Sequence, residues 1–105
     1  MKPTPRRARR FSFATSVELT DLETDAPIRG LATNLSLYGC HVDSTTSLPI
    51  GLKVKISIVH RGVHFVALGR VANARPPFGT GITFTRIEPA DQSILDKWIS
   101  ELRTR

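Results

Sequence analysis

A strict alternation of apolar and polar residues over positions 52–58 constrains the fold of this chain more than any other feature. The segment reads LKVKISI, with an apolar residue at every second position. Successive side chains of a strand point to opposite faces, so this pattern predicts a strand with one face in a core and the other in solvent. The next residues, HRGV at 60–63, predict a tight turn, and residues 63–74 complete a hairpin.

Further strands are expected before and after this hairpin. The candidate segments are residues 13–19, 28–35, 39–43 and 80–87. In the second of them the apolar residues Ile28, Leu31 and Leu35 lie among polar neighbours. Stretches rich in Ser, Thr, Pro and Gly separate the candidates, as expected for loops and turns.

The spacing of apolar residues becomes helical near the end of the chain. Pro89 suits a first helical turn, and Asp91 adds a negative charge where the helix dipole favours one. The apolar residues then form one stripe at spacings of one, three and four: Ile94, Leu95, Trp98, Ile99 and Leu102. A helix over about 89–103 after about six strands predicts an all-β body, either an antiparallel barrel or a curled sheet, with the helix closing one side.

Length and composition narrow the class of protein. The chain has 105 residues, of which 40% are hydrophobic and 23% charged, as expected for one globular domain. Its single cysteine, Cys40, excludes an internal disulfide and a Cys-rich zinc site. No apolar run approaches the roughly 18 residues of a membrane span, and the N-terminal segment is too polar for a secretory signal. We therefore expect a cytoplasmic protein without a membrane span.

The net charge is concentrated at the N-terminus. Residues 1–10 contain five cations and no acid, whereas the whole chain has a net charge of +6. With two prolines and no apolar periodicity, this arm is expected to be flexible, and residues 11–105 to form one domain. A nucleic-acid-binding protein more often spreads Lys and Arg over a folded face. The arm is better suited to binding one compact anion.

Sequence signatures of catalysis are missing. The histidines His41, His60 and His64 do not show the spacing of metal ligands, and no phosphate loop, nucleophile elbow or paired-carboxylate pattern is present. Cys40 lies between Gly39 and His41 in a candidate strand, where a buried, unreactive thiol is the ordinary expectation. The sequence thus predicts no catalytic residue, no metal site and no cofactor.

Two short motifs remain. The arm contains R-x-x-x-R at Arg6 and Arg10, and N-x-S-x-x-G follows at Asn34, Ser36 and Gly39, between two candidate strands. Each motif alone is common, as a solvated basic tail or as an ordinary strand–turn–strand sequence. Together, and with the closing amphipathic helix, they resemble the PilZ domain family over residues 6–102.

This resemblance implies a fold and a ligand. PilZ domains are bacterial six-stranded antiparallel β-barrels with a C-terminal helix, and members that keep both motifs bind the second messenger cyclic di-GMP. The implied ligand residues are Arg6, Arg10, Asn34, Ser36 and Gly39, with Arg7 and Arg9 as further candidates. Arginine can pair with phosphate or with guanine O6 and N7 and can stack on a purine, while asparagine offers a donor and an acceptor. Ser36 would add a hydroxyl, and Gly39 would let the ligand approach the backbone.

The resemblance leaves several points open. Some family members have another arginine directly before R-x-x-x-R, where this chain has Pro5, so the number of bound ligands is not predicted. Ligand binding is expected to order the arm and to change contacts with an unknown partner protein. The alternatives are an interaction module that does not bind nucleotide and, less in keeping with the charge distribution, a small nucleic-acid-binding protein.

Overall fold

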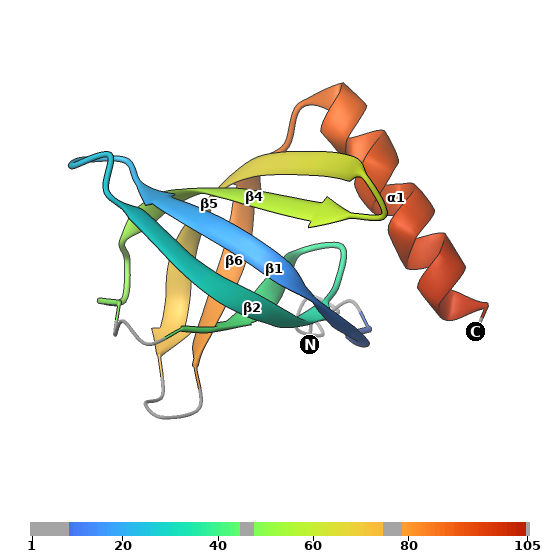
Figure 1. Ribbon diagram of the computed structural model, residues 1–105, viewed down its shortest axis with the longest axis horizontal. Helices are drawn as coiled ribbons and strands as arrows, with labels where there is room; N and C mark the ends of the chain where they lie inside the picture. Colours follow the sequence, from blue (N-terminus) through green and yellow to red (C-terminus); the bar gives the residue numbers. More distant parts are fainter. Residues whose placement is uncertain (1–8, 45–47, 75–78, 105) are drawn as a thin grey trace, which may run out of the picture.

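A computed structural model describes residues 9–44, 48–74 and 79–104 of the chain, shown in Figure 1. The described residues form six strands and one helix: β1 (Phe11–Asp21), β2 (Pro27–Leu35), β3 (Gly39–Asp43), β4 (Lys53–His60), β5 (Val63–Ala74), β6 (Thr80–Arg86) and α1 (Pro89–Arg103). This confirms the predicted fold class. The expected flexible arm lies outside the described residues, apart from Arg9 and Arg10.

The strands close into an antiparallel barrel with the order β1-β2-β3-β6-β5-β4. Strand β1 closes it by pairing with β2 on one side and β4 on the other, so that Val17 lies opposite both Gly30 and Ile58. Closure gives each strand two neighbours and leaves no free sheet edge. Of the two architectures that the strand pattern permits, the chain therefore forms the barrel and not the curled sheet.

The predicted alternation in β4 is confirmed by its burial. Val54, Ile56 and Ile58 are fully buried in the barrel, whereas Lys53 and Lys55 are exposed. Strand β1 begins two residues earlier than the sequence pattern indicates, because Phe11 and Phe13 both point into the core.

In β2 the apolar residue Leu31 is 44% exposed, while the smaller Ala32 is buried. The apolar residues of this segment therefore do not all face the core, since Leu31 points outward. The pairing of β2 with β3 shifts between Ala32 and Asn34, and this irregularity places Leu35 in the core and Asn34 on the outer face.

Helix α1 covers one end of the barrel, next to the β4–β5 hairpin (Figure 1). Its buried residues are Leu95, Trp98, Ile99 and Leu102, and Pro89 occupies the first turn, as predicted. The Trp98 ring lies 5.7 Å from that of Phe13 and 5.9 Å from that of Phe65, measured between ring centroids. The carboxylate of Asp91 accepts a hydrogen bond from the backbone N–H of Val66 in β5, at 2.9 Å. Among the described residues, no helix is long and apolar enough to cross a membrane.

Candidate functional site

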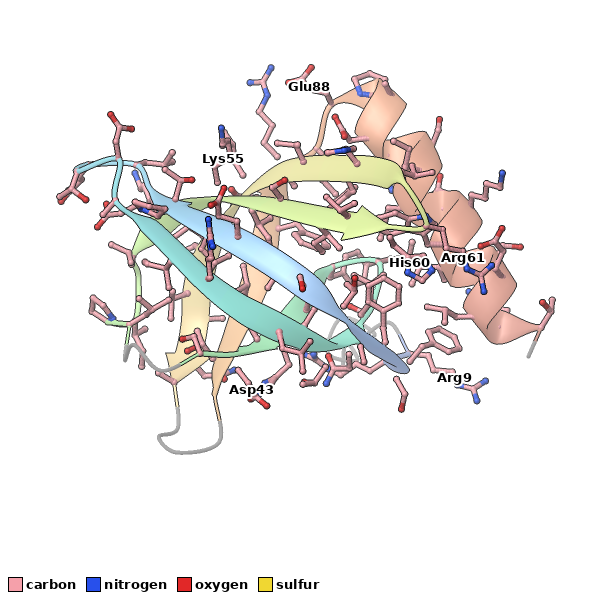
Figure 2. All side chains as sticks on the ribbon, viewed as in Figure 1. Arg9, Asp43, Lys55, His60, Arg61 and Glu88 are labelled. Carbon is pink, nitrogen blue, oxygen red and sulfur yellow. The ribbon has the colours of Figure 1, made fainter. Side chains whose placement is uncertain are left out.

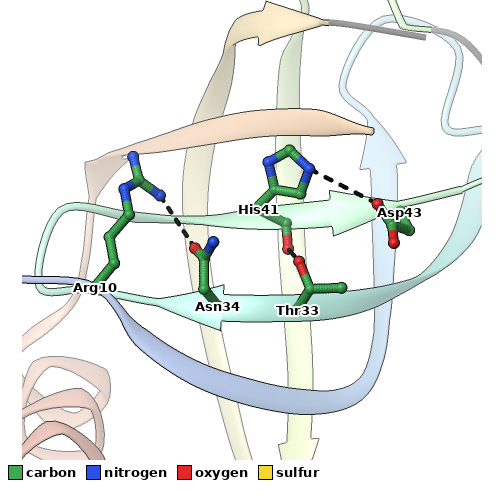
Figure 3. A network of polar contacts seen from close by, with 5 residues as sticks. All are labelled: Arg10, Thr33, Asn34, His41 and Asp43. Atoms are coloured by element: carbon green, nitrogen blue, oxygen red, sulfur yellow. Dashed lines mark hydrogen bonds and ion pairs between the residues drawn. The ribbon is translucent and has the colours of Figure 1, made fainter. Parts of the chain in front are cut away.

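The structure brings the two sequence motifs together at the start of β1. Arg10 immediately precedes β1, where Ser12 lies opposite Asn34 of β2. Arg10 Nη1 donates a hydrogen bond to Asn34 Oδ1 at 3.1 Å (Figure 3). Arg10 is exposed and Asn34 is half-buried, so this pair lies on the outer surface of the barrel, where a ligand can reach it. A contact between residues 24 positions apart thus joins R-x-x-x-R to N-x-S-x-x-G.

Arg9, the other described arginine of the arm, makes a different contact from Arg10. Arg9 is exposed, and its guanidinium carbon lies 5.1 Å from the centroid of the Phe11 ring, within cation–π distance. Figure 2 labels this side chain. Arg6 and Arg7, two further predicted ligand residues, lie outside the described residues. Of the described arginines in the arm, Arg10 is the one that contacts the second motif.

Ser36 shapes the turn between β2 and β3. Its hydroxyl accepts hydrogen bonds from the backbone N–H groups of Tyr38 and Gly39, at 3.1 and 3.2 Å, and donates to the Gly39 carbonyl at 3.3 Å. A serine hydroxyl has one donor and two acceptor positions, so these three bonds use all of them. Ser36 is also buried, with 4% of its surface exposed. Its role in the described conformation is to hold the turn that follows Asn34.

Gly39 is required by the packing of two strands. It opens β3 and lies opposite Thr83 of β6. A Cβ atom at this position would overlap the backbone carbonyl oxygen of Ile82. The absence of a side chain at Gly39 thus lets β6 approach closely in this structure, whereas the approach expected from the sequence was that of a ligand. Gly39 and Ser36 are both buried and fix the turn next to Asn34. Their direct contact with a ligand stays a prediction.

A row of polar residues beside Asn34 was not predicted from the sequence. In the β2–β3 pairing Asn34 lies opposite His41, whose Nε2 atom is 3.7 Å from Asp43 Oδ1. Thr33 Oγ1 also donates to the His41 carbonyl, at 3.5 Å (Figure 3). Counting back from a turn closed between Ser36 and Gly39 would have placed Asn34 and His41 opposite each other. From the sequence, His41 was weighed only as a metal ligand, and that role was rejected because the histidines lack the spacing of metal ligands.

The residues of this row do not form a metal centre. Among the described residues, no group of three or more His, Cys, Asp or Glu side chains could hold a metal ion. Together, Arg10, Asn34 and His41 present hydrogen-bonding groups and positive charge on an open strand surface. This chemistry suits a polar anion with hydrogen-bonding edges.

Cys40 lies directly behind this surface and is fully buried. Burial raises the pKa of the Cys40 thiol from its ordinary value of 9.0 to about 12, although the positive charge of Arg10 acts in the opposite direction. Because the thiolate is the reactive form, Cys40 is held as an unreactive thiol, as the sequence analysis expected.

Alkylation by iodoacetamide tests this state of Cys40. In the folded protein at pH 8, iodoacetamide is expected to leave Cys40 unmodified, whereas unfolding in denaturant exposes it to complete modification. Burial disfavours the charged thiolate in the folded state. The Cys40 contribution to the free energy of unfolding is therefore fully present below about pH 9 and is lost as the pH rises from about 9 to about 12. Rapid modification of the folded protein, followed by mass spectrometry, would contradict the burial.

The fold and the site define a class of protein, a small closed barrel whose outer surface carries a hydrogen-bonded arginine–asparagine pair. Comparison with known families then identifies the group: residues 4–101 match the PilZ domain model, and the chain belongs to the PilZ domain family. No curated protein matched this chain.

Three similar solved structures have the same fold. The PilZ domain of CeSA from a cellulose-synthesizing bacterium has 17% sequence identity and a TM-score of 0.74, covering 91% of this chain and 99% of that chain. The PilZ domain of YcgR from Escherichia coli, solved with c-di-GMP, has 18% identity and a TM-score of 0.72, covering 96% and 93%. The inhibitor of motility MotI/DgrA from Bacillus subtilis has 17% identity and a TM-score of 0.75, covering 97% of this chain and 53% of that chain.

Proposed function

We propose that this protein is a receptor for cyclic di-GMP. The observation that carries the proposal is the contact between Arg10 and Asn34, which brings one residue of each motif together on the outer surface of the barrel. Membership of the PilZ family supports it, as does the similarity to a PilZ domain that was solved with this ligand.

The chemistry of the pair matches the ligand. Cyclic di-GMP carries two phosphates and two guanines, so its receptor needs positive charge and partners for guanine edges in one place. A guanidinium has five N–H donors, and the bond to Asn34 uses one of them. Arg10 can therefore hold Asn34 and still form a paired contact with a phosphate or with guanine O6 and N7. The amide N–H₂ of Asn34 can donate to a guanine acceptor on the same surface.

Arg6 completes the proposed site from the N-terminal arm, with Arg7 and Arg9 as further candidates. Binding orders the arm against the barrel, because the phosphates relieve the mutual repulsion of the arginines and fix both ends of R-x-x-x-R. The altered surface then changes contacts with a partner protein. On this proposal the protein acts in the bacterial cytoplasm as a signalling module without catalytic activity.

Isothermal titration calorimetry with cyclic di-GMP tests this function. We expect saturable binding to cyclic di-GMP and much weaker binding to cyclic di-AMP, because adenine replaces the O6 acceptor of guanine by an N6 donor. Amide hydrogen exchange on the same complex is expected to slow around residues 6–11 more than around 34–39. The absence of heat and of exchange protection with cyclic di-GMP would leave the interaction module without nucleotide as the function. Equal binding to unrelated DNA sequences would instead favour nucleic acid.

A further inference from the structure

The turn between β1 and β2 carries an unusual combination of charge and exposed apolar surface. Residues 21–25, here called the acidic turn, contain Asp21, Glu23 and Asp25 and no cation. Leu22 lies among these acids and is 43% exposed. Lys53 and Lys55 lie on the neighbouring strand β4, and in the described part of the chain neither forms a salt bridge with the acidic turn.

Hydrogen bonds hold the acidic turn in one conformation. Asp21 donates from its backbone N–H to the Ala26 carbonyl at 3.0 Å, and Asp25 donates to the Asp21 carbonyl at 2.8 Å. The Asp21 carboxylate also accepts from the N–H of Glu23 at 2.8 Å, and Leu22 donates to the Lys53 carbonyl of β4 at 3.1 Å. The turn therefore presents Leu22 and its flanking carboxylates with little conformational entropy left to lose on binding.

A groove with complementary properties lies at the other end of the molecule, between the β4–β5 turn and α1. It is here called the α1 groove, and its lining includes His60, Arg61, Val63, Ile94, Lys97 and Trp98. Its volume is about 300 Å³, and a hollow of about 260 Å³ extends it toward Phe13. This volume is at the lower end for ligand pockets, about 300–1,000 Å³, and suits one apolar side chain better than a nucleotide.

Charges at the edge of the α1 groove favour an acidic occupant. Arg61 and Lys97 contribute two positive charges against one negative charge from Glu101. Arg61 also occupies a position unusual for its residue type, since its backbone φ of +54° lies in the left-handed region that Asn or Gly normally occupies in such a two-residue turn. Figure 2 places Arg61 and His60 beside α1, away from the acidic turn. The basic arm of the same chain is a poor occupant, because its charge has the same sign.

We infer that the acidic turn of one molecule docks in the α1 groove of a second copy of this chain, with Leu22 in the groove and its carboxylates next to Arg61 and Lys97. The two surfaces lie at opposite ends of β4, since Asp21 is paired with Val54 at its start and Arg61 follows its last residue. The contact is therefore head-to-tail, and each added copy leaves one acidic turn and one α1 groove unoccupied. Association then proceeds beyond a dimer unless the associated copies close into a ring.

The association is expected to be weak and sensitive to salt. A five-residue turn in this groove buries much less than the roughly 1,600 Å² of a standard protein interface, which places the contact among transient ones. Because its ion pairs are near the surface, salt at several times the physiological concentration is expected to weaken it. The inference does not depend on cyclic di-GMP, and its failure would leave the proposed receptor function untouched.

Sedimentation equilibrium of the full chain tests the inference at protein concentrations from about 20 μM to about 1 mM, where contacts of millimolar to micromolar affinity become visible. We expect the average mass to rise with concentration. Glu23→Lys on the acidic turn, or Lys97→Glu on α1, is expected to weaken association at least tenfold, about 1.4 kcal/mol. An equimolar mixture of these two variants restores association, because the unchanged turn of one variant meets the unchanged groove of the other. The two reversed surfaces also carry opposite charges and can pair with each other.

Two further variants separate docking from general charge effects. Glu18→Lys makes the same charge change on the side of the barrel and is expected to leave association unchanged. Arg61→Asn removes a groove charge while relieving the left-handed backbone, so it is expected to weaken association without lowering the melting temperature. A chain that remains monomeric throughout, or association that survives both Glu23→Lys and Lys97→Glu, would overturn the inference. Sensitivity to Lys97→Glu alone would also overturn it, since another segment would then fill the groove.

Discussion

Replacing Trp98 by alanine is expected to lower the free energy of unfolding by about 3–5 kcal/mol, the usual loss for a large buried aromatic side chain. Trp98 is 4% exposed, and its ring packs against Phe13, Phe65 and His60, the last at 5.4 Å between centroids. These contacts join α1 to β1, β4 and β5 at once, and the truncation leaves a cavity beneath the helix. A small domain has a total stability of about 5–15 kcal/mol, so the loss is a large fraction of it.

Urea unfolding followed by far-UV circular dichroism measures this effect. Ser100→Ala, on the exposed side of the same helix, is the matched control and is expected to change stability by less than about 0.5 kcal/mol. Trp98→Phe retains much of the ring contact, so we expect an intermediate loss, which remains measurable if the alanine variant does not fold. Equal stability of Trp98→Ala and the original chain would show that α1 is not part of the core.

Replacing Arg10 by alanine is expected to weaken cyclic di-GMP binding at least tenfold, which corresponds to about 1.4 kcal/mol. The substitution removes both the proposed phosphate or guanine contact and the bond that positions Asn34. Arg10→Lys is expected to recover only part of the affinity, because an ammonium keeps the charge but neither forms a paired fork nor stacks on a purine. Calorimetric titration of each variant gives these affinities.

The control for Arg10 is an arginine outside the site. Arg29 lies on β2, and its side chain is 88% exposed. Its Nε atom lies 3.9 Å from Glu18 Oε2. Arg29→Ala removes the same charge and is expected to leave ligand affinity nearly unchanged. Melting temperatures of both variants should stay close to that of the original chain, because each loses only an exposed polar contact. Equal affinity of Arg10→Ala and Arg29→Ala would remove Arg10 from the site.

Local sequence patterns predicted the elements that bury one face. The alternation at 52–58 and the stripe from Ile94 to Leu102 correspond to β4 and to the buried side of α1, since each pattern repeats with the period of its own element. The pattern was less informative in β2. Leu31 faces outward there because the shift in pairing after Ala32 changes which residues point inward, and a shift of this kind is set by the neighbouring strand.

The candidate site was predicted in its residue types but not in its geometry. The motifs named Arg10 and Asn34, but their hydrogen bond depends on the register of β1 against β2, in which Ser12 meets Asn34. His41 joined the same surface only through the β2–β3 pairing. Residues far apart in the chain meet according to strand register, and no local repeat encodes that register completely.

The sequence by itself determined which segments form strands and helix, that the positive charge is at the N-terminus, and which family motifs the chain carries. The tertiary structure alone decided that Arg10 meets Asn34 and that Gly39 makes room for the Ile82 carbonyl of β6. Periodicity and charge are properties of neighbouring residues, so they can be read along one segment. Close packing between β3 and β6 is a property of two segments far apart in the chain, and it exists only once the barrel has closed.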